Sequence, residues 1–232
     1  MSFSPTTGSG REMSLLTPDV PFGHPAFALS ADQLATVLDL VCRGAQEARS
    51  DVKPGMLEVP TTMIVRKAMR RVKKLLDLTN LEVRGEHELE DMATTDESIL
   101  GRVDITLKFL HQFGNEDAYV AIECKRVGAG LSTLNASYVS NGVDRFVTGQ
   151  YAAGHEWGFM LGYVLALPVE DVVNIVADRI RKTYGEAAEL TSEAAHALSL
   201  AILEGALSQK GGHSIRLKHI FIDMTPARAV RR

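Results

Sequence analysis

The sequence has very little cysteine, no long apolar run and no large excess of charge of either sign. Cys42 and Cys124 are its only cysteines, which excludes a disulfide framework and a four-cysteine zinc site. The longest apolar run, from Trp157 to Pro168, is too short to span a bilayer. Because the formal net charge is only −4, any nucleic-acid site would have to be a local basic patch.

Targeting and nucleotide-binding motifs are also missing. The N-terminal residues lack the basic start and apolar stretch of a signal peptide, so we expect a cytoplasmic protein that does not enter the membrane. No glycine-rich phosphate loop of the GxxxxGK[ST] type occurs, which argues against an intrinsic ATPase. With 45% hydrophobic and 23% charged residues, the chain has the composition of a globular protein. We expect an irregular arm over residues 1–29 and a single domain over residues 30–232.

The hydrophobic pattern predicts alternating helices and strands. A helix is expected from Ser30, and the strongest helical periodicity follows Pro60-Thr61-Thr62. Strands are expected where apolar and polar residues alternate or where apolar runs are short. This order predicts an α/β protein with a mixed central sheet flanked by helices on both faces. The expected strands are 81–89, 103–109, 119–127, 157–167 and 215–224, and the further expected helices are 134–151, one after Pro168, and 192–207.

One side of the helix after Pro60 is strongly basic. Lysine and arginine contacts with phosphates supply most of the nonspecific affinity for nucleic acid, so this side is a candidate phosphate-binding face. A solvated helix face, balanced by acidic residues between 86 and 97, explains the same pattern equally well. The candidate phosphate-binding residues are Arg66, Arg70, Arg71 and Lys74 on this helix, with Arg126 and Arg145 further along the chain.

Three polar residues lie within the predicted sheet. Asp104 is in a half-buried strand pattern, and Glu123 and Lys125 lie in a mostly apolar one. Side chains alternate faces along a strand, so Glu123 and Lys125 share a face, and pairing of the two strands would bring Asp104 beside Glu123. Two adjacent carboxylates repel each other, and Mg²⁺ is a hard cation that binds carboxylate oxygens and leaves positions for a phosphate. Lys125 could then hold the attacking water or neutralise phosphate charge.

Asp104 followed by Glu123-Cys124-Lys125 resembles the signature of the PD-(D/E)xK, or restriction-endonuclease-like, nuclease superfamily. The resemblance covers about residues 56–167 and implies an αβββαβ core, followed by a C-terminal extension over 168–232 with extra helices and a strand. Val103 stands where the group usually has proline. The resemblance implies metal ligation by Asp104, Glu123 and the backbone carbonyl of Cys124.

The resemblance also implies an assisting glutamate and further contacts. Glu58, before the basic helix, is the best match for the glutamate of the first core helix, and Glu86 and Glu88 are rivals. Gln150 and Tyr151 match a glutamine and a tyrosine that some branches carry on the helix after the signature lysine. The implied cofactor is Mg²⁺, with Mn²⁺ as a substitute. The implied partners are double-stranded DNA, further copies of the chain and a possible protein of a defence system.

The expected function is therefore a metal-dependent endonuclease that hydrolyses phosphodiester bonds in DNA. The resemblance favours prokaryotic defence against foreign DNA, with DNA repair next. A nuclease that acts on RNA through the same site is one alternative. A catalytically silent nuclease-like domain that binds nucleic acid or a protein is another. A surface ion pair of Asp104 or Glu123 with Lys125 is the structural alternative for the three residues.

Overall fold

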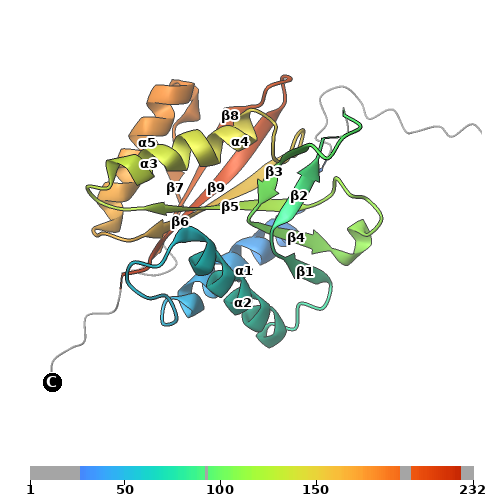
Figure 1. The fold of residues 1–232 in the computed structure, drawn as a ribbon, viewed down its shortest axis with the longest axis horizontal. Helices are drawn as coiled ribbons and strands as arrows, with labels where there is room; N and C mark the ends of the chain where they lie inside the picture. The colour runs from blue at the N-terminus through green and yellow to red at the C-terminus, as the bar shows by residue number, and fades with distance from the viewer. Residues whose placement is uncertain (1–26, 92–93, 194–199, 226–232) are drawn as a thin grey trace, which may run out of the picture.

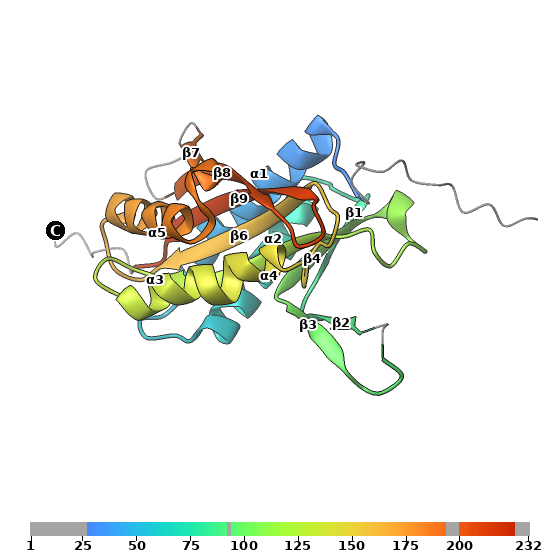
Figure 2. The ribbon, with the colours of Figure 1, turned by 90° about the horizontal axis from the view of Figure 1, so that it is seen from above.

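The computed structural model describes residues 27–91, 94–193 and 200–225 (Figures 1 and 2). The predicted arm therefore lies outside the described residues except for Phe27, Ala28 and Leu29. Phe27 makes an isolated parallel bridge with His155, and its carbonyl accepts from the amide of Glu156. No helix of the described residues is both long and apolar enough to span a lipid bilayer.

A seven-stranded mixed sheet forms the centre of the molecule, as the sequence predicts. Neighbouring strands are antiparallel at one edge of the sheet, parallel in its middle and antiparallel again at the other edge. In spatial order the strands are β1 (Leu81–Arg84), β4 (Ile105–Phe109), β5 (Val120–Val127), β6 (Trp157–Val164), β9 (Ser214–Asp223), β8 (Leu200–Ser208) and β7 (Thr191–Ser192).

Helices cover both faces of this sheet, which confirms the predicted layered arrangement. On one face lie α1 (Ala31–Ala48) and α2 (Glu58–Leu75). Ser30 caps α1 through a capping box with Gln33, as its position before the apolar periodicity predicts. On the other face lie α5 (Val169–Tyr184) and a helical stretch after β5, and each layer buries its own hydrophobic cluster against the sheet.

The helical stretch after β5 is not regular. It consists of α3 (Ser132–Tyr138), a π-helical turn (Val139–Val143) and α4 (Asp144–Val147), and so it ends four residues before the predicted 151. Gly142 lies in the π-helical turn. A β-carbon there would lie 2.6 Å from Cε of Met160 and 3.3 Å from Cγ of Lys125, so glycine gives the lysine stem room to pass.

Two predicted strands are interrupted, and a hairpin fills the interruption. The expected strand 81–89 divides into β1 and β2 (His87–Glu90), and the expected strand 103–109 divides at Asp104 into β3 (Ile99–Val103) and β4. β2 and β3 pair with each other and project from the body of the molecule (Figure 2). Asp104 therefore lies at the bend where the chain leaves the hairpin and enters the sheet.

The predicted helix over 192–207 is wrong. Its residues 200–207 belong to the strand β8, which pairs along its whole length with β9, and 194–199 lie outside the described residues. The segment is a short apolar run, and periodicity alone does not separate a buried strand from a buried helix in such a run. Pairing with β9 decides the outcome. The described part of the C-terminal extension therefore contributes one α-helix and three strands, not several helices and one strand.

Candidate active site

The site begins where the β4–β5 ladder ends. The last paired residues are Ile105 and Ile122, and the same register continued by one residue brings Asp104 opposite Glu123. There the chain bends away into the hairpin, while β5 continues to Val127. The amide of Cys124 donates to Oδ2 of Asp104 at 2.8 Å, in place of a ladder hydrogen bond. A side chain thus satisfies a buried backbone donor that would be costly to leave unpaired.

Glu58 satisfies the next donor along this edge. Its Oε2 accepts from the amide of Arg126 at 3.1 Å. Glu58 is the first residue of α2, so this helix starts two residues before Pro60, where the sequence predicts its beginning. The positive end of the helix dipole favours a carboxylate at this position. Two carboxylates from separate elements therefore line the edge of β5 beyond β4.

Lys125 contacts both predicted glutamates, Glu58 and Glu123. Its Nζ lies 2.6 Å from Oε1 of Glu123 and 3.1 Å from Oε1 of Glu58, and it donates to the carbonyl oxygen of Cys124 at 3.1 Å. Lys125 is 7% exposed and Glu123 is fully buried. This burial does not fit the alternative of a solvated surface ion pair.

The carboxylates influence one another electrostatically. Burial, and then the nearby charge of Asp104, raise the pKa of Glu123 to about 8. Burial also raises the pKa of Asp104, and Lys125 opposes that shift. Burial alone would lower the pKa of Lys125, but the charges of Glu123 and Glu58 outweigh it and raise that pKa. The raised pKa values of Glu123 and Asp104 mean that burial disfavours their charged forms, which the neighbouring cations offset only in part.

One oxygen of the cluster has no partner. Oε2 of Glu123 is buried and forms no hydrogen bond with any residue that the structure describes, although Oε1 accepts from Lys125. With Asp104 and the Cys124 carbonyl, this oxygen provides the hard donor type that Mg²⁺ and Mn²⁺ prefer. Across residues 27–91, 94–193 and 200–225, however, no group of three or more His, Cys, Asp or Glu side chains is arranged to hold one ion. Two carboxylates and a backbone carbonyl are therefore the candidate ligands for a cation here.

The rivals for the assisting glutamate lie away from this cluster. Glu88 is on β2, where its Oε1 pairs with Arg102 at 2.8 Å in an exposed ion pair. Glu86 is exposed in the short connection between β1 and β2. Of the three candidate glutamates, Glu58 is the one that contacts Lys125.

The basic face of α2 is only partly available to a ligand. Arg70 donates twice to the carbonyl oxygen of Val83, at 2.9 and 3.1 Å, and Arg71 forms an ion pair with Glu47. Lys74 is exposed. The guanidinium group of Arg66 packs against Gly85.

The other predicted phosphate contacts fall into two kinds. Nε of Arg66 and Nε of Arg126 are both buried, and neither has a hydrogen-bond acceptor among the described residues. Arg145 instead pairs with Glu123, with Nη1 lying 3.2 Å from Oε1. Gln150 donates to the carbonyl oxygen of Leu100 on β3. Arg66 and Arg126 thus each keep one unpaired donor, and Arg145 and Gln150 have partners within the protein.

Sequence reasoning missed Gly142. Its importance comes from its approach to the stem of Lys125, 17 residues earlier in the chain. A glycine inside a helical pattern costs stability by about 0.5–1 kcal/mol relative to alanine, which is a signal that a packing reason exists. That signal does not identify the neighbour.

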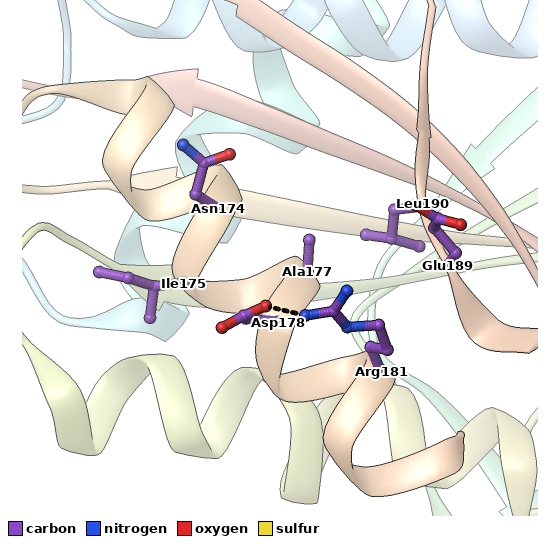
Figure 3. A pocket seen from close by; sticks show the side chains of 7 residues that line it. All are labelled: Asn174, Ile175, Ala177, Asp178, Arg181, Glu189 and Leu190. Carbon is purple, nitrogen blue, oxygen red and sulfur yellow. Dashed lines mark hydrogen bonds and ion pairs between the residues drawn. The ribbon is translucent and has the colours of Figure 1, made fainter. Parts of the chain in front are cut away.

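A surface hollow of about 460 Å³ lies elsewhere, between α5 and the segment that leads into β7 (Figure 3). An ion pair of Asp178 and Arg181, 2.7 Å apart, lies along it. The residues of the carboxylate cluster are not among those that line it.

Comparison with known proteins gives no relative. No protein-family model matches the chain, and neither a curated protein nor a solved structure does.

Proposed function

We propose that this protein is a Mg²⁺-dependent nuclease that hydrolyses phosphodiester bonds in DNA. The observation that carries the proposal is the convergence of Glu58, Asp104, Glu123 and Lys125 at the edge of β5 beyond β4. Nothing in the pairing of a sheet requires three acidic side chains and a lysine to meet among apolar residues. Burying such charges is costly without a compensating function or partner.

The order of elements around the cluster supports the same proposal. α2 precedes the antiparallel strands β1, β4 and β5, and β5 connects through α3 and α4 to the parallel strand β6. This order agrees with the αβββαβ order that the resemblance implies, if the β2–β3 hairpin is taken as an insertion between the first two strands. Asp104 and Glu123-Cys124-Lys125 have the signature's positions in that order.

The residues have distinct roles in the proposed reaction. A divalent cation held by Asp104, Glu123 and the Cys124 carbonyl would supply water activation and charge neutralisation at the phosphate. Lys125 orients the attacking water and offers a point charge to the phosphate oxygens. Glu58 binds the ammonium of Lys125 and the amide of Arg126, and so fixes the edge of β5 against the start of α2.

The resemblance, more than the geometry, supports the rest of the proposal. It supports double-stranded DNA as substrate, a cytoplasmic setting and prokaryotic defence as the context, with possible partner proteins. Mn²⁺ would substitute for Mg²⁺. Because one such site cuts one strand, a homo-oligomer would bring two sites to a duplex.

A second candidate function is a silent nuclease-like domain that binds nucleic acid or a protein. One observation favours it. The ammonium of Lys125 already joins Glu58, Glu123 and the Cys124 carbonyl, so an internal cation balances part of the cluster.

Nicking of supercoiled plasmid in Mg²⁺, with EDTA as the negative control, tests the two functions. We expect Glu123→Gln to abolish cleavage and Lys125→Met to reduce the rate by about 10²–10³-fold, the effect of losing one electrostatic stabiliser. Glu204→Gln is the matched control, because Glu204 pairs with the buried Lys218 at 2.6 Å on β8 and β9. Equal cleavage by the parent and both site variants would refute the assignment. Binding of DNA without any cleavage would favour the silent domain. The same cleavage assay run with RNA as substrate would identify a ribonuclease.

A further inference from the structure

Arg145 is the residue whose surroundings differ most from those expected of a phosphate contact. It lies on α4, and its Nη1 is 3.2 Å from Oε1 of Glu123. The same nitrogen donates to the hydroxyl of Tyr151, and the guanidinium carbon lies 5.1 Å from the centre of the Tyr151 ring. The Tyr151 ring is fully buried, so it provides a fixed support for the guanidinium group.

Both cations of the site contact the same oxygen of Glu123. Oε1 lies 2.6 Å from Nζ of Lys125 and 3.2 Å from Nη1 of Arg145, whereas Oε2 is buried and has no partner in the described part of the chain. Two cations on one oxygen fix the rotation of the carboxylate. They leave Oε2 as the oxygen that is free to accept a further cation.

The chain of contacts continues to the other carboxylate. The hydroxyl of Tyr151 donates to the carbonyl oxygen of Arg102, two residues before Asp104. Gln150 donates to the carbonyl oxygen of Leu100, also on β3. Gly101 lies between these two anchored carbonyls, and a β-carbon there would lie 2.5 Å from Nε2 of Gln150. The hairpin strand that leads into Asp104 is therefore packed tightly against the segment after α4.

We propose that Arg145 is a positioning residue for the metal-binding carboxylates rather than a contact to the DNA phosphates. Arg145 holds Glu123 with Oε2 free, and through Tyr151 it fixes the bend that carries Asp104. This inference rests on the proposed function, because it assigns a role within the same site. It replaces the role in phosphate binding that the sequence suggests for Arg145.

Removing a side chain that hydrogen-bonds to a metal ligand typically reduces metal affinity or activity by about 10–100-fold. We therefore expect Arg145→Gln to weaken Mn²⁺ binding, measured by calorimetry without DNA, by about 10–100-fold. The kcat for nicking should fall over the same range while KM for plasmid changes little. Tyr151→Phe keeps the ring and the Arg145–Glu123 pair but removes the hydroxyl contacts with Arg145 and Arg102, so we expect a smaller loss of both quantities. Arg145→Lys should recover part of the loss because it restores the charge.

The salt dependence of DNA binding separates positioning from phosphate contact. A lost phosphate contact reduces the log–log slope by about 0.9 on duplex DNA, whereas a positioning residue leaves the slope unchanged. Arg216→Gln is the matched control, because Arg216 also pairs with a glutamate, Glu204, and lies 4.3 Å from the centre of the Trp157 ring. It should leave Mn²⁺ affinity and kcat at the parent values.

Two results would overturn the inference. A reduced salt slope with unchanged Mn²⁺ affinity in Arg145→Gln would make Arg145 a phosphate contact. Parent values for both Arg145→Gln and Tyr151→Phe would leave the carboxylates independent of this chain of contacts. If Arg145→Gln does not fold, Tyr151→Phe tests the link to Asp104 and Arg145→Lys tests the pair with Glu123, and parent values in both would overturn the inference. A parent protein that neither binds Mn²⁺ nor cleaves nucleic acid would refute the proposed function itself, which is a different outcome from the first two.

Discussion

The backbone amide of Cys124 donates to the carboxylate of Asp104 at 2.8 Å, one step beyond the last backbone pair of β4 and β5. The aspartate therefore does two things at once. It ends the ladder by satisfying an edge donor, and it brings a carboxylate opposite Glu123. A structural effect and a chemical effect of changing Asp104 can be separated because they depend on different properties of the side chain.

The first prediction concerns Asp104→Asn and Asp104→Ala. Asparagine keeps an oxygen that can accept from Cys124, whereas alanine leaves that amide unsatisfied. We expect Asp104→Ala to lower the free energy of unfolding by about 1–3 kcal/mol and Asp104→Asn to lower it much less. Both should abolish cleavage, since neither supplies a charged ligand. Urea denaturation and plasmid nicking measure the two effects. Equal stability of the two variants would mean that the hydrogen bond contributes nothing.

The second prediction concerns Gly142→Ala. The added methyl group would meet Cε of Met160, the end of a flexible side chain, and Cγ of Lys125, which must move by a few tenths of an ångström. Overpacking of this kind costs about 1–3 kcal/mol. We expect a lower rate of nicking as well, because the displaced stem carries the ammonium away from Glu123 and Glu58.

Gly205→Ala provides the control for this change. A β-carbon at Gly205 would lie 2.4 Å from Cδ2 of Leu190, away from the carboxylate cluster. Its cost should appear in thermal melting but not in the nicking rate of the folded protein. A parental rate in Gly142→Ala would show that Lys125 tolerates the shift.

The third prediction separates the arginines near α2. Arg66 and Arg126 each have a buried Nε without an acceptor, whereas Arg70 donates to the Val83 carbonyl and Arg71 pairs with Glu47. In an Asp104→Asn background, which prevents cleavage, we expect Arg66→Gln and Arg126→Gln each to reduce the salt slope of duplex binding by about 0.9. Arg71→Gln should leave the slope unchanged. A reduced slope in Arg71→Gln, with unchanged slopes in Arg66→Gln and Arg126→Gln, would instead assign phosphate binding to the outer face of α2.

Part of this structure was predictable from the sequence, and the reasons differ from element to element. The alternation around Glu123 and Lys125 predicts their shared face because the strand repeat of two residues is local. The capping box of Ser30 and Gln33 is local too. The strand β8 was mispredicted because its apolar run is stabilised by pairing with β9, a partner that periodicity does not reveal.

The site was less predictable than the strand that carries it. The signature suggested Glu58, but its contacts with Lys125 and Arg126 span 67 and 68 residues. The pairing of Arg145 with Glu123 depends on the position of α4, which the preceding π-helical turn determines. Such contacts follow from the tertiary arrangement, and a single sequence contains no pattern that specifies them.

The fourth prediction concerns the pH dependence of stability and depends on His155. This residue is 2% exposed, and its ring lies between Phe27 and Tyr119, with both ring centres 5.1 Å away. Burial lowers its pKa to about 4, partly offset by the backbone carbonyl and the charge of Asp117. In the unfolded chain the imidazole of His155 has a pKa near 6.5 and binds a proton below that pH. In the folded protein the same imidazole stays neutral down to about pH 4. Stability therefore falls as the pH decreases through this window.

The expected loss from His155 by about pH 4 is roughly 3 kcal/mol, since each unit of pKa difference corresponds to about 1.4 kcal/mol. Other groups also titrate in this range, so the test compares slopes. His155→Phe keeps an aromatic ring between Phe27 and Tyr119 but cannot be protonated, so its free energy of unfolding should decrease less between pH 6.5 and pH 4 than that of the parent. His111→Phe, at an exposed position, should keep the parental slope. Parallel slopes for the parent and His155→Phe, measured by urea denaturation at each pH, would exclude His155 as the source of acid sensitivity.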